Sequence, residues 1–212
     1  VYNKTTFEGH GTYTVVSATE ESGKFIVTVK ERIANLNTWG ECRVTFLSHT
    51  PEFVFRNNIV RNKRNRGILV QVPNAIIENN AFINVGHGSI QAASAMDQFN
   101  EATVPQGLTI RNNKFIHNNY LKEGTLYGDV SVFAISSNAS VAPAGTIKNY
   151  VLENNFFSEN GNSCISMRGV GDSVVKNCLF YNASASQPSG DSYNCLFNFY
   201  NTSNITIENS YN

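Results

Sequence analysis

The sequence predicts an all-β protein whose main part is a right-handed parallel β-helix, and three observations support this fold class. A phrase of the form apolar-x-apolar-x-Asn-Asn-x-Phe recurs along the chain. A second short stretch with strand character follows each of five copies, namely RGILVQV, GSIQAAS, DVSVFAIS, SCISMRG and NCLFNFY. No segment shows a sustained helical apolar period, and proline is scarce, with five of 212 residues, so few helices are expected.

The phrase occurs in four clear copies and two weaker ones. The clear copies are FVFRNNIV, AIIENNAF, LTIRNNKF and YVLENNFF, which begin at residues 53, 75, 108 and 150, and the weaker ones are SVVKNCLF and ITIENSYN, from residues 173 and 205. The sixth positions of successive copies lie 22, 33, 42, 23 and 32 residues apart. These intervals indicate a coil of 22 or 23 residues with outward insertions of about ten or twenty. Each coil of such a pectate-lyase-like solenoid buries its apolar positions only by stacking on its neighbours.

Asparagine is abundant, with thirty residues, many of them in adjacent pairs. It disfavours helix interiors, suits turns and tolerates the left-handed backbone region. Stacked asparagines can also bond to the next coil and satisfy buried polar groups. We therefore expect an inward structural column at the sixth position, formed by Asn58, Asn80, Asn113 and Asn155. The phenylalanines two positions later should form a stacked core column, Phe82, Phe115, Phe157 and Phe180.

The two ends of the chain differ from the repeat. The stretches GTYTVVSA, TEESGK and FIVTVKE indicate an antiparallel hairpin, so residues 1–40 are expected to form a β-hairpin or partial barrel beside a β-helix of residues 41–212. The last copy stops within a repeat without an amphipathic cap. A bare coil end is a sheet edge that invites aggregation, so we expect the sequence to be a piece of a longer chain or another subunit of an oligomer to cover this end.

Charge and hydropathy exclude several classes of partner. Sixteen acidic and sixteen basic residues cancel, which gives no overall field toward nucleic acid or an anionic membrane. No apolar run approaches the roughly 18 residues of a membrane span, and the first residues lack the order of a signal peptide. With 41% hydrophobic residues the chain can bury a core, so it should be globular.

The four cysteines show none of the paired spacings of a zinc site. They stand at Cys42, Cys164, Cys178 and Cys195. Because Cys164 and Cys195 occupy similar places in successive second strands, we expect them to stack about 5 Å apart inside the coil. The sequence therefore predicts buried thiols rather than metal ligands.

Chemistry is expected in the long insertions, because the strands of a solenoid are committed to stacking. The insertion AMDQFNEATVPQG carries Asp97 and Glu101, with Phe99 between them as a platform for a sugar face. Arg64 and Arg66 stand just before a strand of an earlier coil, and His87 stands at the same place on the next coil. Trp39 and Glu41 precede the first full coil. Carboxylates, guanidinium groups and aromatic rings together are typical of a carbohydrate site, since glycosidic cleavage needs two carboxyl groups, one acting as an acid. The alternative interpretation is a charged loop that is merely solvated.

Two runs, TPEFVFRNNIVRNKRNRGILVQVPNAIIENNAF and MDQFNEATVPQGLTIRNNKF, resemble glycoside hydrolase family 110, the bacterial α-1,3-galactosidases, over roughly residues 50–115. The shared order is Thr-Pro-Glu, Arg-Gly-Ile-Leu and an acidic-aromatic-acidic loop. In this loop Asp97, Phe99, Glu101 and Ala102 follow the family, whereas Asn100 and Thr103 depart from it. The segment before Thr-Pro-Glu is often acidic in the family and is GECRVTFLSH here, which leaves Glu41 as a substitute.

The resemblance implies a catalytic β-helix joined to small β-barrels, acting without metal or other cofactor as an exo-hydrolase that removes terminal α-linked galactose with inversion. Asp97 and Glu101 would be two members of an acidic cluster, with a third from Glu41 or a further segment. Arg66 and His87 would hold sugar hydroxyls, or Arg66 would cap a strand. Inversion needs an acid and a base roughly 6.5 to 9.5 Å apart, which carboxylates one or two coils apart can meet at about 4.8 Å per coil. The spacing leaves open which carboxylate is the acid.

The insertions at residues 95–107, 116–128 and 137–148 should wall a groove on the coil, the partner should be a carbohydrate, and the location should be secreted or periplasmic. A polysaccharide lyase or epimerase on the same coil would instead abstract a proton next to a uronic carboxylate, often with calcium, and no Asp-rich calcium cluster is visible in the sequence. A non-catalytic β-helix for glycan binding or adhesion is the other alternative.

Overall fold

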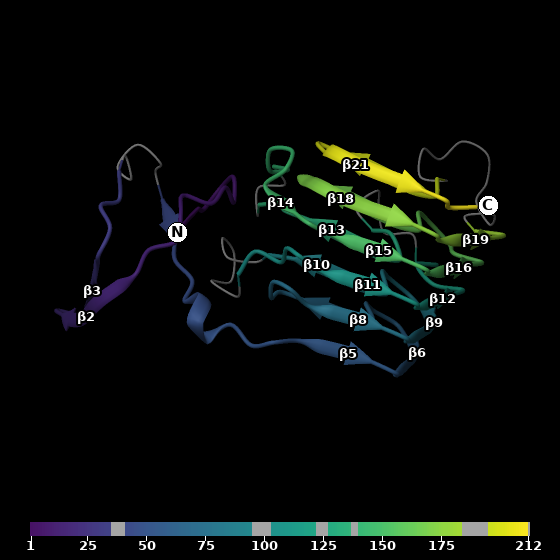
Figure 1. Ribbon diagram of the computed structural model, residues 1–212. Coiled ribbons are helices and arrows are strands. Elements are labelled where there is room, and N and C mark those ends of the chain that lie inside the picture. Colours follow the sequence, from purple (N-terminus) through teal and green to yellow (C-terminus); the bar gives the residue numbers. More distant parts are fainter. Residues whose placement is uncertain (35–40, 95–102, 122–126, 137–139, 184–194, 212) are drawn as a thin grey trace.

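The computed structural model describes residues 1–34, 41–94, 103–121, 127–136, 140–183 and 195–211 (Figure 1). Within these ranges the regular structure is almost entirely strand, and a 3-10 turn spans Leu47–His49. Three parallel sheets stack coil upon coil, as the arrows of Figure 1 show. The predicted parallel β-helix is therefore confirmed.

Each coil contributes a strand to each of the three sheets in turn. The first sheet contains β5 (Val54–Arg56), β8 (Ile76–Glu78), β11 (Thr109–Arg111), β15 (Val151–Glu153), β18 (Val170–Lys176) and β21 (Ser203–Glu208), with short β14 (Ile147–Lys148) beside β18. The second contains β6 (Ile59–Lys63), β9 (Ala81–Val85), β12 (Lys114–Ile116), β16 (Phe156–Ser158) and β19 (Leu179–Tyr181). The third contains β7 (Ile68–Val70), β10 (Ile90–Ala93), β13 (Val130–Phe133), β17 (Ile165–Arg168) and β20 (Phe197–Tyr200). Each copy of the repeated phrase thus spans two strands, one in the first sheet and one in the second. The separate stretch that was predicted to follow each phrase forms the strand of the third sheet.

Residues with positive φ turn the chain at each of the three corners. Most of them lie between strands, and some, such as Asn62 in β6 and Asp172 in β18, lie within a strand. The first corner uses the fifth position of the phrase: Asn57, Asn79, Asn112, Asn154, Asn177 and Asn209. The second uses Asn62, Asn84, His117, Glu159 and Asn182, and the third uses Asn74, Gly107, Asn149, Asp172 and Asn204. Twelve of the thirty asparagines stand at these corners because asparagine adopts positive φ at lower cost than most residues.

The second asparagine of each pair forms the predicted inward ladder. The backbone N–H and Nδ2 of Asn113 both donate to Oδ1 of Asn155, at 3.0 and 3.1 Å, and Asn80 makes the same two bonds to Asn113, each at 3.0 Å. Nδ2 of Asn113 also donates to the Ile77 carbonyl at 2.9 Å. Cys178 continues the column, and its thiol lies 3.8 Å from the Leu152 carbonyl oxygen. Burial raises the pKa of this thiol, while hydrogen bonds from Asn155 lower it.

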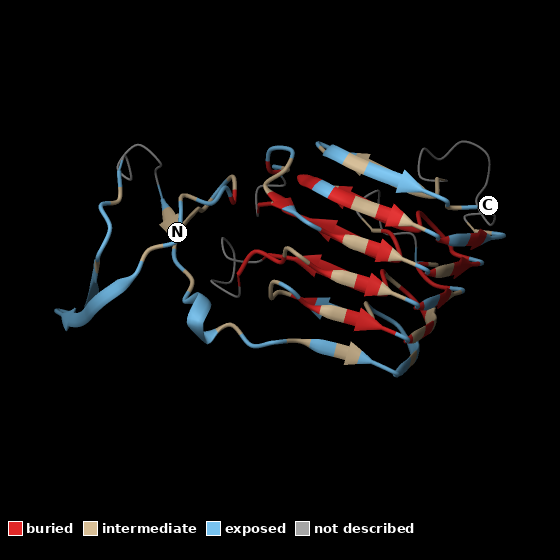
Figure 2. Ribbon diagram, in the orientation of Figure 1, coloured by how far each residue is buried: buried red, intermediate tan, exposed pale blue. Residues whose placement is uncertain are grey.

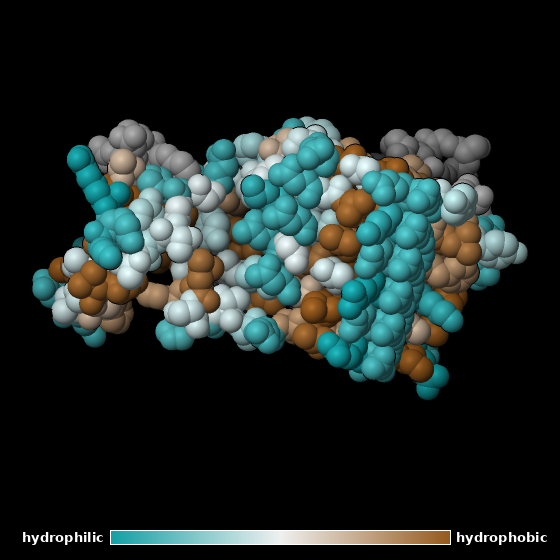
Figure 3. All heavy atoms as spheres, viewed as in Figure 1, coloured by the Kyte–Doolittle hydropathy of each residue, from teal (hydrophilic) through white to brown (hydrophobic). Residues whose placement is uncertain are grey.

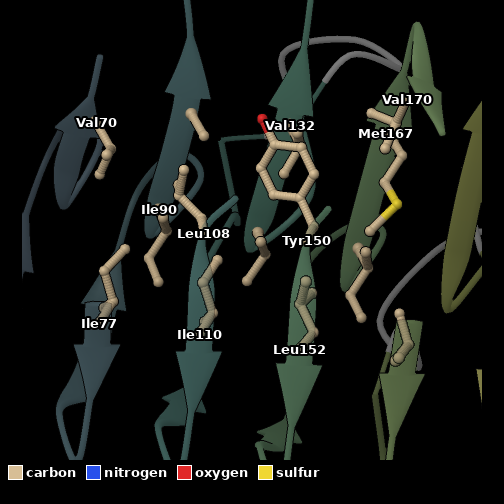
Figure 4. Close-up of a cluster of buried hydrophobic side chains, with 14 of the residues drawn as sticks. Val70, Ile77, Ile90, Leu108, Ile110, Val132, Tyr150, Leu152, Met167 and Val170 are labelled. Atoms are coloured by element: carbon tan, nitrogen blue, oxygen red, sulfur yellow. The ribbon is translucent and has the colours of Figure 1, made fainter. Parts of the chain in front are cut away.

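The core fills the coil with apolar side chains from all three sheets. Figure 4 shows residues of the first sheet, such as Ile77, Ile110 and Leu152, facing residues of the third, such as Ile90 and Val132. The predicted phenylalanine column is confirmed: ring centroids lie 5.3 Å apart between Phe82 and Phe115, 4.7 Å from Phe115 to Phe157 and 5.1 Å from Phe157 to Phe180. All four rings are buried, so the column belongs to the core.

The outer face of the first sheet carries a ladder of alternating charge at the fourth position of the phrase. Strand register aligns, in order, Arg56, Glu78, Arg111, Glu153, Lys176 and Glu208. Ion pairs join Glu78 to Arg56 at 3.3 Å and to Arg111 at 2.7 Å, and Lys176 lies 3.1 Å from Glu153. A continuous hydrophilic stripe crosses the stacked coils in Figure 3. Opposite charges directly across strands stabilise a sheet, so this ladder supports the register of the coils.

The N-terminal hairpin is confirmed, and it lies beside the coil in Figure 1. Strands β2 (Val15–Glu21) and β3 (Lys24–Val29) pair antiparallel around Ser22 and Gly23, which have φ of 53° and 73°. The hairpin is exposed over almost its whole length, as Figure 2 shows. A second antiparallel pair joins β1 (Tyr2–Asn3) to β4 (Cys42–Arg43). Phe7, between these elements, is fully buried within the hydrophobic core cluster, so the N-terminal segment contributes to the coil.

The predicted stacking of Cys164 on Cys195 is wrong by one residue. Strand register pairs Ile165 with Phe197, and Leu196 accepts backbone hydrogen bonds from both Cys164 and Ile165. Cys195 instead lies beside Ser163, with 3.6 Å between Sγ and Oγ. A shift of one residue reverses the face of a strand to which a side chain belongs, and sequence similarity alone did not fix this register.

Candidate functional site

The insertion with Asp97, Phe99 and Glu101 lies outside the described residues, as does Trp39. The residues that bracket it are described: Ser94 follows β10, and Thr103 precedes β11. Both are buried, and the Thr103 N–H donates to the Gln71 carbonyl at 3.3 Å. The residues on either side of the insertion, Ser94 and Thr103, are therefore buried in the coil, between strand β10 of the third sheet and strand β11 of the first.

Arg66 and His87 stand on neighbouring coils where β7 and β10 begin. Nη1 of Arg66 donates to Oε1 of Gln91 at 2.8 Å, and both side chains belong to the outer side of the third sheet. The His87 ring meets the Tyr127 ring edge-on, with 5.9 Å between centroids, and Tyr127 meets Phe133 in the same way at 6.3 Å. The structure thus brings these two predicted residues to one edge of one sheet. Arg64, by contrast, is exposed at the preceding corner.

Glu41 has a different environment from the other predicted site residues. Its carboxylate forms an ion pair with Lys4, next to the β1–β4 pairing. The hydrogen bond and the charge of Lys4 lower the pKa of Glu41. The side chain is exposed, so this pair is mainly a surface contact of the N-terminal segment.

A cavity of about 640 Å³ opens where the N-terminal segment meets the third corner of the coil. Its wall includes Thr103 and Gly107, which follow the insertion, and Asn74 and Asn149 from adjacent coils. Glu52 is the acidic side chain among the described residues of this wall. A volume of this size is typical of small-molecule sites. Glu52 was not among the residues predicted from the sequence, although it belongs to the Thr-Pro-Glu motif, which could have pointed to it.

Asp129 is a fully buried carboxyl group immediately before β13. Neither of its oxygens has a hydrogen-bond partner in the structure as described. Burial raises the pKa of Asp129 well above its usual value, so the carboxyl group keeps its proton in the interior. This side chain is fully buried, so its properties bear on stability.

Two properties of the described ranges concern cofactors and membranes. Among those residues no group of three or more His, Cys, Asp or Glu side chains is placed to hold a metal ion. None of their helices has the length and apolar character that crossing a membrane requires.

Part of the chain is similar in amino-acid sequence to known proteins. No family model matches it. It is 35% identical over 118 residues to the Alpha-1,3-galactosidase B of Akkermansia muciniphila, 30% over 101 residues to that of Phocaeicola vulgatus and 31% over 96 residues to that of Bacteroides fragilis. These matches cover 55%, 47% and 44% of this chain. They cover only 15%, 17% and 16% of the relatives, so the chain spans about a sixth of the length of the curated relatives it matches.

Proposed function

We propose that this protein belongs to a carbohydrate-active exo-glycosidase of the glycoside hydrolase family 110 type, which removes terminal α-linked galactose with inversion. The observation that carries the proposal is the cavity of about 640 Å³, because its wall includes Thr103, which stands two residues after Glu101 in the sequence. The relatives named Alpha-1,3-galactosidase B support a galactoside as the substrate class. A secreted or periplasmic location is part of the proposal, since a glycan substrate would be met outside the cytoplasm.

The chemistry proposed for the site uses two carboxyl groups. One carboxylic acid protonates the oxygen of the glycosidic bond as the bond to the anomeric carbon breaks. The other, as a carboxylate, takes a proton from a water molecule that attacks the opposite face of the sugar. Asp97 and Glu101 are assigned to these two roles as a pair. Arg66 and His87 are proposed to bind hydroxyls at the edge of the third sheet where β7 and β10 begin, which is separate from the cavity wall.

Hydrolysis of an α-1,3-linked galactoside tests the proposal. The full chain is assayed with Asp97→Asn and Glu101→Gln, and Glu20→Gln in the exposed hairpin is the matched control. Each of the first two variants should lose about 10² to 10⁴-fold in turnover, and the control should keep the wild-type rate. Proton NMR during the reaction should show β-galactose as the first product.

Other outcomes of this assay lead to different conclusions. Unchanged rates in both variants would remove Asp97 and Glu101 from the chemistry. Binding of galactosides by an inactive wild-type chain would favour the glycan-binding alternative. Cleavage of uronic oligosaccharides that yields an unsaturated product would identify a lyase instead.

A further inference from the structure

We propose that Glu52 is a sugar-contacting carboxylate of this site, with Asn74 as its hydrogen-bonding neighbour. This inference rests on the proposed function, since it assigns the third acidic position to Glu52 in place of Glu41. The contact lies in the cavity beside the third corner, and the proposed occupant of this cavity is a single neutral pyranose ring with free hydroxyls.

The local backbone directs Glu52 into the cavity. The N–H of Ile76 donates to the carbonyl of Phe53 at 3.0 Å, which extends the pairing of β5 and β8 by one residue toward the N-terminus. Successive side chains of an extended strand face opposite sides. Phe53 is partly buried and packs against the core, so its neighbour Glu52 faces outward and lines the cavity wall.

The wall continues next to Glu52 along the third corner of three successive coils. Asn74, Gly107 and Asn149 all have positive φ there, at 57°, 70° and 66°. A Cβ atom on Gly107 would lie 2.5 Å from Oδ1 of Asn74, so the Asn74 amide occupies the space that a side chain on the next coil would fill. Glycine at position 107 therefore leaves room for the side-chain amide of Asn74, which is in register with Glu52 on the neighbouring coil. The N–H of Asn74 is separately bonded to the Gln106 carbonyl at 2.8 Å, which fixes the corner itself.

These groups match the chemistry of a pyranose. A carboxylate accepts hydrogen bonds from two adjacent hydroxyls, and an amide both donates and accepts. The cavity wall also includes Tyr2, whose ring can cover an apolar sugar face. Glu41 is bound to Lys4 instead, whereas Glu52 shares a wall with Thr103, two residues after Glu101 in the sequence.

The test is galactose binding by the full chain, measured by isothermal titration calorimetry. Glu52→Gln should weaken binding by at least about tenfold, because it removes charge-assisted hydrogen bonds to the sugar. Glu41→Gln is the matched control and should bind as the wild type does. Asn74→Gly removes the amide while allowing positive φ, and it should also weaken binding. Thermal unfolding of Glu52→Gln should match that of the wild type, which separates a sugar contact from a structural role.

The outcomes distinguish this inference from the proposed function. If the wild type binds galactose without hydrolysing galactosides, and Glu52→Gln weakens that binding, the contact is supported while the hydrolase is not. Wild-type affinity in both Glu52→Gln and Asn74→Gly would overturn the inference even in an active enzyme. Absence of galactose binding by the wild-type chain would overturn it as well.

Discussion

Tyr150 donates its phenolic hydrogen to the carbonyl oxygen of Pro105, which lies 45 residues earlier in the chain. Tyr150 is fully buried, as Figure 4 shows for its ring within the core, and burial raises the pKa of Tyr150 well above its usual value. The hydroxyl therefore keeps its proton and remains a donor. The bond fastens the segment that follows the Asp97 and Glu101 insertion to the next coil.

Replacing Tyr150 by Phe should destabilise the protein by about 1 to 3 kcal/mol, because the buried Pro105 carbonyl would lose this partner. Urea unfolding measures the difference. Tyr181→Phe is the control, since Tyr181 is 66% exposed and its hydroxyl can be replaced by water contacts. Equal stability of the two variants would mean that the Pro105 carbonyl finds another donor.

Replacing Asn113 by Ala should cost about 2 to 4 kcal/mol, because it leaves the Ile77 carbonyl and the Asn80 N–H without their bonds to this side chain. Asn65→Ala, at an exposed site where the side chain accepts the Arg66 N–H at 2.8 Å, should cost no more than about 1 kcal/mol. Chemical denaturation of both variants checks the contrast. A small effect at Asn113 would show that the ladder is not a main source of stability.

Replacing Glu159 by Asn should stabilise the protein by about 0.5 to 1 kcal/mol. Glu159 is exposed and has φ of 55°, a region that costs L-residues roughly 1 to 2 kcal/mol and that asparagine tolerates better. The reverse change at an exposed residue of the same corner, Asn182→Glu, should destabilise by a similar amount, since Asn182 has φ of 47°. Melting temperatures of the two variants should therefore move in opposite directions, and a shift of both in the same direction would contradict the corner assignment.

Replacing Asp129 by Asn should reduce the loss of stability at rising pH. The pKa of Asp129 in the folded state is raised above its usual 3.8, so the folded protein holds a proton that the unfolded chain releases. The stabilising contribution of this proton is full below that usual value and is lost as the pH rises through the folded-state pKa. The melting temperature of the variant relative to the wild type should increase between acid and neutral pH. Parallel curves would exclude titration of Asp129 as the cause.

Much of the fold was predictable because the phrase repeats the two properties that a coil needs, inward apolar residues and asparagines at bends. The two asparagines of a pair could not be told apart from the sequence, since the same residue type serves Asn112 at the corner and Asn113 in the ladder. The alternation of Arg and Glu at the fourth position was present in the sequence and would have predicted the charge ladder. The register of Cys164 was not predictable, because the connections that precede β17 and β20 differ in length.

The site was predictable only in part, for a similar physical reason. Arg66 and His87 were placed on neighbouring coils from repeat spacing, since that spacing fixes where strands begin. Glu41 was chosen for its place before the first coil, but its ion pair with Lys4 depends on the β1–β4 pairing, which joins segments far apart in sequence. Glu52 became a candidate only when the cavity wall was known.

The charge ladder restricts how the number of coils can change during evolution. Arg56, Glu78 and Arg111 stand on three successive coils, so loss of the middle coil would place Arg56 directly against Arg111. Loss of the next coil would likewise bring Glu78 against Glu153. Like charges directly opposite each other destabilise a sheet. Duplication or deletion of two coils at a time preserves the alternation, whereas removal of one interior coil places like charges in register.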